Sequence, residues 1–295
     1  MKLQTIAAAA ILAFAGAANA SLSNFESGNS SVAFVSYDNV GAVQGSVFVD
    51  LGFSFNDFIP SSLPGGSVGN LSSENTSVVW NFGNNTITKN GVTQSSTNNF
   101  SAFAAYTAAA GADAKWGVMA GNTVTDVLGN TSYMATGKPT ASQLTQQADS
   151  SPLQLVAPLY NNTNAAITGS DDNGSYFAPS AADGAWVANT AYGMGAGNWQ
   201  NNTKWSTVTN LTQLNAYYLY ADGTEAVMGA TVTAGADTTG LLNGKGTFTL
   251  DKVAQTLTWK TATFAVTPSI PEPSSYALAL VALAAIGVAT RRKAK

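Results

Sequence analysis

The sequence predicts a mainly β fold: an antiparallel β-sandwich or jelly-roll-like body with one or two short helices. Three observations favour this fold, namely short runs of β-branched and aromatic residues, dense turn residues between these runs, and an alternating hairpin near residue 250. We assign this body to residues 21–268 of the 295-residue chain, which is long enough to bury a sizeable core.

The first 20 residues have the pattern of a removable secretory signal peptide. Lys2 supplies a short charged region, and residues 6–18 form an apolar run. The small residues Ala18 and Ala20 then mark a site for signal peptidase. We therefore expect the protein to be exported and its mature chain to start at Ser21.

Strand-like runs follow at residues 32–37, 47–51 and 78–82. Their β-branched and aromatic side chains suit a pleated, half-buried surface. Turn dipeptides such as Asn90-Gly91 and Asp222-Gly223 separate the runs and supply left-handed backbone at low steric cost.

The clearest hairpin joins residues 246–250 to residues 256–260. Both runs alternate, so Phe248 and Leu250 share one face with Leu257 and Trp259, while threonines occupy the other face. We expect a sheet with one buried face and one face in water.

Two segments have helical patterns, residues 100–110 and, more weakly, residues 140–148. The first is rich in alanine and stops at Gly111, which suits a C-terminal cap. Residues 152–158 lie between prolines and fit an edge strand. Residues 161–202 are rich in Asn, Gly and Ala, and we expect long loops there.

Charge and composition exclude several functions. Between residues 21 and 270 the chain has seven Lys, no Arg and fifteen acids, so nucleic acid is not an expected partner. The chain contains no Cys and no His, which rules out disulfides, His or Cys zinc sites and nucleophiles that depend on histidine. Residues 171–174 lack the spacing of a calcium loop, and we expect no metal or cofactor.

The C-terminal segment, residues 269–295, has three ordered parts. Pro271, Glu272 and Pro273 come first, then an apolar stretch at about 274–290, then a basic tail at 291–295. An apolar helix of this length reaches about 25 Å, the short limit for a transmembrane helix. We expect three basic residues to act as the stop-transfer charge and to keep the tail cytoplasmic: Arg291, Arg292 and Lys293.

This ordered segment resembles the PEP-CTERM sorting signal. The resemblance implies an exosortase as processing partner, with Pro271, Glu272 and Pro273 as the recognition motif. It also implies a precursor anchored in the inner membrane and a mature form at the cell surface or outside the cell. The body more loosely resembles proteins that carry this tail, at residues 217–221, 246–250 and 256–259. Their inferred setting is the exopolysaccharide or biofilm matrix.

We therefore expect an exported surface or matrix protein that is not an enzyme. One alternative is a carbohydrate-binding module, for which Trp186, Trp199 and Trp205 are the candidate glycan platform because they fall in loop-like sequence. A second alternative is a secreted glycoside hydrolase with paired carboxylates. The other tryptophans lie in or near strand-like runs and are expected in the core: Trp80, Trp116 and Trp259.

Overall fold

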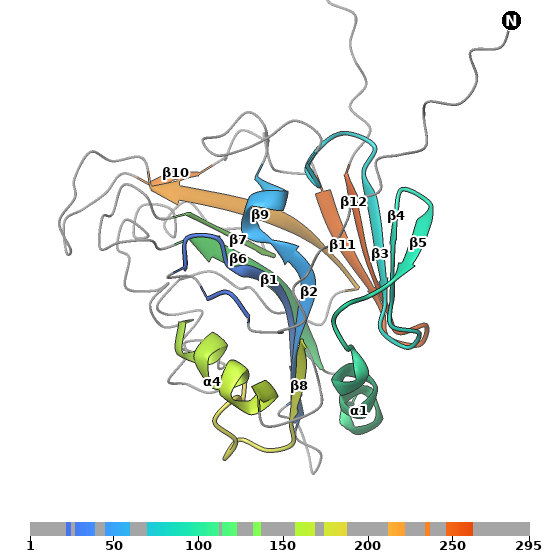
Figure 1. The fold of residues 1–295 in the computed structure, drawn as a ribbon, viewed down its shortest axis with the longest axis vertical. Coiled ribbons are helices and arrows are strands. Elements are labelled where there is room, and N and C mark those ends of the chain that lie inside the picture. The colour runs from blue at the N-terminus through green and yellow to red at the C-terminus, as the bar shows by residue number, and fades with distance from the viewer. Residues whose placement is uncertain are drawn as a thin grey trace, which may run out of the picture. The chain divides into compact units, whose positions relative to one another are not determined.

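Figure 1 shows the computed structural model of the chain. It describes residues 22–24, 27–38, 45–59, 70–111, 114–122, 132–136, 157–168, 174–187, 212–221, 234–236 and 246–261. All of these residues belong to one compact unit, Met1–Ala262. The predicted signal peptide, the helix at 140–148 and the C-terminal segment lie outside the described residues. Of the edge strand predicted at 152–158, residues 152–156 also lie outside them, whereas residues 157 and 158 begin helix α4 (Ala157–Thr168), so the strand prediction was wrong there.

The described residues form one antiparallel sheet of twelve strands, which confirms the mainly β prediction. The strands pair in the order β5-β4-β3-β12-β11-β9-β7-β6-β1-β2-β8, and β10 pairs with β9. The first strands along the chain are β1 (Ser31–Asp38), β2 (Gly45–Ser54), β3 (Ser77–Asn81), β4 (Thr86–Lys89), β5 (Val92–Ser95) and β6 (Lys115–Asn122). The later strands are β7 (Ser132–Thr136), β8 (Ser175–Ala178), β9 (Gln213–Ala221), β10 (Ala234–Ala236), β11 (Gly246–Asp251) and β12 (Thr256–Thr261).

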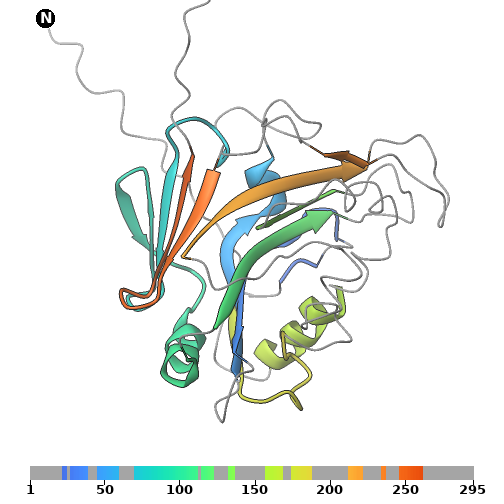
Figure 2. The ribbon, with the colours of Figure 1, turned by 180° about the vertical axis from the view of Figure 1, so that it is seen from behind.

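The two layers of the body come from one sheet that curls, and β9 is the strand shared by both. Residues 213–215 of β9 pair with β11, and residues 216–220 pair with β7. The two views of the ribbon show the half formed by β3, β4, β5, β11 and β12 turned against the half formed by β1, β2 and β6 (Figures 1 and 2). The core therefore lies inside the curl of one sheet.

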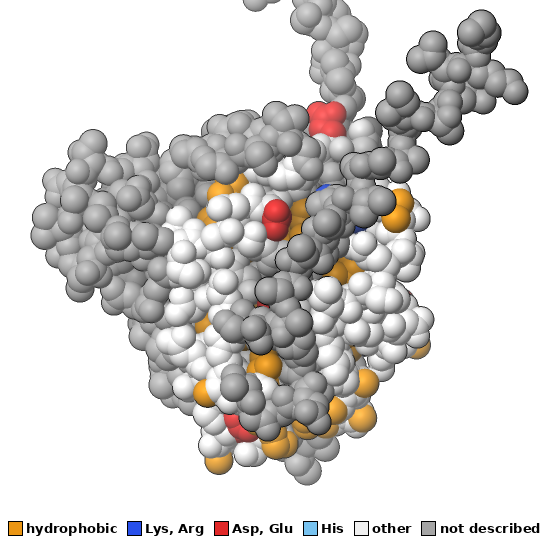
Figure 3. All heavy atoms as spheres, in the orientation of Figure 1, with side chains coloured by type: hydrophobic (Ala, Val, Ile, Leu, Met, Phe, Trp, Pro, Cys, Tyr) orange, Lys and Arg blue, Asp and Glu red, His pale blue; other side chains and the backbone are white. Residues whose placement is uncertain are grey.

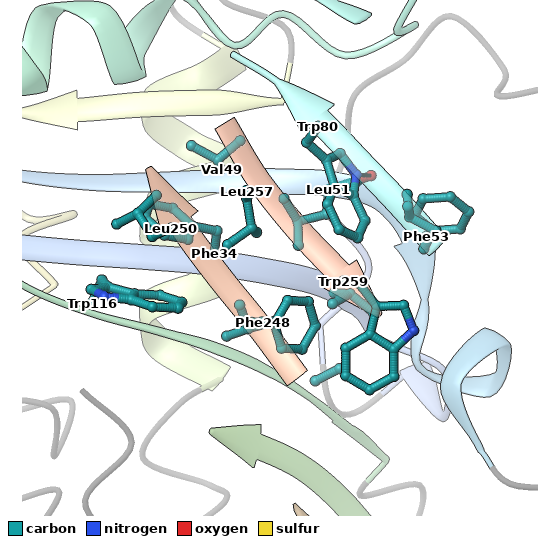
Figure 4. Packing of buried hydrophobic residues seen from close by; sticks show 14 of the residues in the cluster. Phe34, Val49, Leu51, Phe53, Trp80, Trp116, Phe248, Leu250, Leu257 and Trp259 are labelled. Atoms are coloured by element: carbon teal, nitrogen blue, oxygen red, sulfur yellow. Dashed lines mark hydrogen bonds between the residues drawn. The ribbon is translucent and has the colours of Figure 1, made fainter. Parts of the chain in front are cut away.

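Aromatic side chains fill the space between the two halves (Figure 4). Phe53 of β2 meets Trp80 of β3 with ring centroids 5.7 Å apart, and the Trp80 indole N–H donates to the carbonyl of Leu51 at 2.7 Å. The short 3-10 helix η2 (Phe55–Phe58) places Phe58 5.3 Å from the ring of Trp259. Buried aromatics with a satisfied polar atom contribute strongly to core stability, and they hold the curled sheet closed.

Helix α1 (Ser101–Ala109) confirms the helix predicted at residues 100–110. Ala102, Phe103 and Tyr106 are buried in the same core cluster as the strands. The C-cap residue is Ala110, one residue before the glycine that the sequence suggested. The N–H of Gly111 instead donates to the carboxylate of Asp38 at 2.6 Å. The helix therefore closes one end of the core.

Helix α4 (Ala157–Thr168) and strand β8 show that the prediction of long loops from residue 161 was wrong for these segments. Leu159, Tyr160 and Ile167 of α4 are buried, and the Tyr160 ring lies 5.0 Å from that of Phe48 in β2. The local sequence is rich in Asn and Thr, which favour helices only weakly. Tertiary burial against the sheet stabilises the helix instead.

The predicted hairpin at residues 246–260 and the predicted turn at Asn90-Gly91 are both confirmed. Strands β11 and β12 pair Phe248 with Trp259 and Leu250 with Leu257, and all four side chains are buried. Asn90 and Gly91 both have positive φ, 49° and 83°, as a two-residue hairpin turn between β4 and β5 requires.

Candidate functional site

The outer surface of six neighbouring strands, β5, β4, β3, β12, β11 and β9, presents a regular polar array. In β4, β3, β12, β11 and β9, residues that point outward alternate with residues buried in the core. No residue of β5 is buried, and Thr93 and Ser95 join this surface because they lie opposite Thr88 and Thr86 of β4. We call this surface the threonine face. Its residues are Thr93, Ser95, Thr86, Thr88, Ser77, Val79, Asn81, Thr256, Thr258, Lys260, Thr247, Thr249, Asp251, Gln213 and Asn215.

The strand register sets these side chains in rows that cross the sheet. One row runs through Thr249, Thr258, Val79, Thr88 and Thr93, each opposite the next on the neighbouring strand. Rows of this kind repeat about every 4.8 Å from strand to strand and about every 7 Å along a strand. The hydroxyls therefore lie on a two-dimensional grid, apart from the single apolar position at Val79.

The threonine face is almost uncharged. Lys260 and Asp251 are its two charged residues, and their charges cancel. The hydroxyls of Thr88 and Thr93 lie 2.8 Å apart and share a hydrogen bond across strands. On the side of the molecule drawn in Figure 3, few of the described side chains are acidic or basic. Such a surface offers both hydrogen-bond donors and hydrogen-bond acceptors.

A second polar feature is buried beside β1 and β2. The Asp50 carboxylate accepts hydrogen bonds from the Ser31 hydroxyl at 3.0 Å and from the Gly52 N–H at 2.8 Å. Burial raises the pKa of Asp50 to about 6, although these two hydrogen bonds oppose the shift. The Tyr160 hydroxyl donates to the Ser31 carbonyl at 3.0 Å. This cluster ties β2 to β1 and α4, and it is shielded from solvent.

Other described carboxylates also bond to the protein's own backbone and hydroxyl groups. Asp57 accepts from the N–H and hydroxyl of Ser54, and Asp251 accepts from the N–H groups of residues 253 and 254. Asp183 accepts from the Tyr176 hydroxyl at 2.9 Å. Within the described ranges, no three His, Cys, Asp or Glu side chains form a group able to hold a metal ion.

The predicted tryptophan roles have different outcomes. Trp80, Trp116 and Trp259 are buried, as the sequence predicts. Trp186, a candidate for the glycan platform, is only 4% exposed, and therefore offers no open ring surface for stacking on a sugar. Residue 186 lies in loop-like sequence, but this loop packs against β2, where the N–H of Val187 donates to the Ser46 hydroxyl. Trp199 and Trp205 lie outside the described residues.

The remaining predicted sites also lie outside the described residues. They are the signal peptidase site at Ala18 and Ala20, the motif Pro271, Glu272 and Pro273, and the basic residues Arg291, Arg292 and Lys293. Among the described helices, none has the length and apolarity to cross a membrane. The threonine face was foreseen only in part: the hairpin prediction placed threonines on the wet side of β11 and β12. The same Thr-X-Thr spacing occurs at residues 86–88, and it would have indicated that the polar face continues onto β4.

Comparison with known proteins identifies the C-terminal segment. The family model of the PEP-CTERM protein-sorting motif matches residues 269–293, which include the Pro-Glu-Pro motif and the basic residues up to Lys293. No curated protein and no solved structure matches the chain.

The matched segment is the one in which the sequence shows a Pro-Glu-Pro motif, an apolar stretch and a basic tail. The chain is therefore a PEP-CTERM sorting-signal protein, an exported protein sorted by an exosortase.

Proposed function

We propose that the protein is a non-enzymatic component of the cell surface or extracellular matrix and that it associates there with exopolysaccharide. The observation on which this rests is the sorting signal at residues 269–293, which directs an exported body out of the cell. The body at residues 21–268 contains no Cys or His and few charged side chains.

The described side chains support a role in binding over one in catalysis. A glycoside hydrolase needs two carboxyl groups that face each other across the scissile bond. Asp50 lies buried against Ser31, and Asp57, Asp183 and Asp251 bond to turns or to neighbouring hydroxyls. Each of these four carboxylates has a structural partner, and the threonine face is built mainly of neutral hydroxyls and amides.

Fractionation of the native host tests the proposal. The protein should be recovered with the extracellular polysaccharide, and it should move to the culture medium in a strain that cannot make this polymer. A mutant without the protein should still turn the polymer over at the normal rate. Recovery of the protein away from the polymer in both strains, or loss of polymer cleavage in the mutant, would contradict the proposal.

A further inference from the structure

We infer that the threonine face is the surface by which this protein binds polysaccharide, and that its ligand is an uncharged, hydroxyl-rich chain lying across the strands. The inference rests on the proposed function and adds to it a location and a ligand class. It starts from the grid of hydroxyls and amides on strands β5, β4, β3, β12, β11 and β9.

The chemistry of the face excludes other classes of partner. A nucleic acid or an anionic polymer requires clustered Lys and Arg, and this face has Lys260 alone, balanced by Asp251. The core of a stable protein interface is typically enriched in apolar and aromatic side chains, and a lipid surface requires a broad apolar area. Val79 is the one apolar residue on the face. The remaining class of partner is a neutral polysaccharide. Its hydroxyls both donate and accept hydrogen bonds, as the side chains of the face do.

Several hydroxyls of the face are available to such a ligand. Thr249 is exposed, and Thr247 and Thr258 are partly exposed. Within the described ranges, these three hydroxyls make no hydrogen bond to another protein group, so water now satisfies them. Replacing that water with sugar hydroxyls changes the free energy only modestly at each contact. Strong binding therefore requires many contacts in parallel.

The regular spacing of the face provides such parallel contacts. The row from Thr249 to Thr93 crosses five strands, and one neighbouring row adds Thr256, Thr86 and Ser95. An extended polysaccharide repeats its hydroxyls along its length, so one chain meets many threonines and amides in succession. Strand β5 ends the sheet, which leaves the rows open at that edge. Among the described strands, none therefore blocks a long chain at this edge.

Affinity electrophoresis of the full chain, solubilised in mild detergent, tests the inference. The gel contains hydroxyethylcellulose, dextran or galactomannan as neutral probes, or alginate as an acidic one. We expect retardation by at least one neutral polymer, weak dependence on salt, and little retardation by alginate, which the acidic body repels. Retardation mainly by alginate, or by no polymer, would overturn the inference.

Three variants locate the surface. Thr249→Val with Thr258→Val removes two adjacent hydroxyls but keeps the β-branched shape, and should weaken binding about three- to tenfold because each net hydrogen bond contributes modestly. Val79→Thr completes the row and should strengthen binding about twofold. Ser180→Ala removes an exposed hydroxyl away from the face and should have no effect. Unchanged thermal melting confirms that each variant is folded.

The outcomes separate this inference from the proposed function. If the chain binds a neutral polymer and the valine and threonine variants leave the affinity unchanged, the threonine face is not the binding surface, while the proposed function stands. If the protein fails to accompany the polysaccharide in its native host, the proposed function itself is wrong. Weaker binding by the Thr249→Val, Thr258→Val double variant together with stronger binding by Val79→Thr would support both the inference and the proposed function.

Discussion

Gly246, the first residue of β11, has no room for a side chain. A Cβ atom built there would lie 1.8, 2.1 and 2.5 Å from three carbon atoms of the Trp259 indole. Real Cβ atoms do not approach other atoms this closely, so either the strand or the ring must move. Trp259 is only 3% exposed, and its indole N–H donates to the Leu71 carbonyl at 2.7 Å, which holds the ring in place.

We therefore expect Gly246→Ala to reduce the free energy of unfolding by about 3 kcal/mol, the upper end of the cost of overpacking a core. For a domain of this size, that loss lowers the melting temperature by about 6–12 °C. The assay is thermal and urea unfolding followed by circular dichroism. Gly184→Ala is the matched control, because a Cβ at residue 184 would meet nothing within 4 Å.

A second substitution tests the cause. The three indole carbons that meet the added Cβ are absent from phenylalanine, so Gly246→Ala should cost less than about 1 kcal/mol when Trp259→Phe is already present, a coupling of about 2 kcal/mol. If Gly246→Ala destabilises the protein equally in both backgrounds, or no more than Gly184→Ala does, the close contact between residue 246 and Trp259 is not the reason for glycine.

Three further predictions concern pH, sorting and export. Because burial raises the folded-state pKa of Asp50 to about 6, the folded protein binds this proton more tightly than the unfolded chain does, so the contribution of Asp50 to stability should be complete below about pH 4 and should fall by about 3 kcal/mol as pH rises through about 6. Asp50→Asn should remove this slope in urea unfolding measured from pH 4 to 7, and a slope retained in that variant would assign it to other groups. Glu272→Ala removes the one charge of the Pro-Glu-Pro motif but leaves the apolar stretch unchanged, so the precursor should accumulate in the inner membrane of cells with an exosortase; immunoblots that show shortening and export as efficient as in wild type would make the motif incidental. N-terminal sequencing of the exported protein should begin at Ser21, and a sequence that began at Met1 would contradict cleavage after Ala20.

The sequence by itself determined the features that depend on local pattern. Alternation in residues 246–250 and 256–260 places Phe248 and Trp259 on one face, because side chains in a strand alternate between its two sides. The turn at Asn90 and Gly91 follows from the low cost of left-handed backbone at these residue types. The sorting signal was recognisable for the same reason, since its three parts are consecutive in the chain.

The tertiary structure decided the features that depend on contacts between distant segments. Nothing in the local sequence of β9 indicates that it joins both halves of one curled sheet, because its pairing with β11 and β7 is set by residues far along the chain. Helix α4 forms in a segment of weak helix formers because Tyr160 gains burial against Phe48. Trp186 likewise becomes buried, although the sequence around it is typical of an exposed loop. The threonine face has the same origin: each strand carries only two or three of its polar residues, and the register of the folded sheet aligns them into rows.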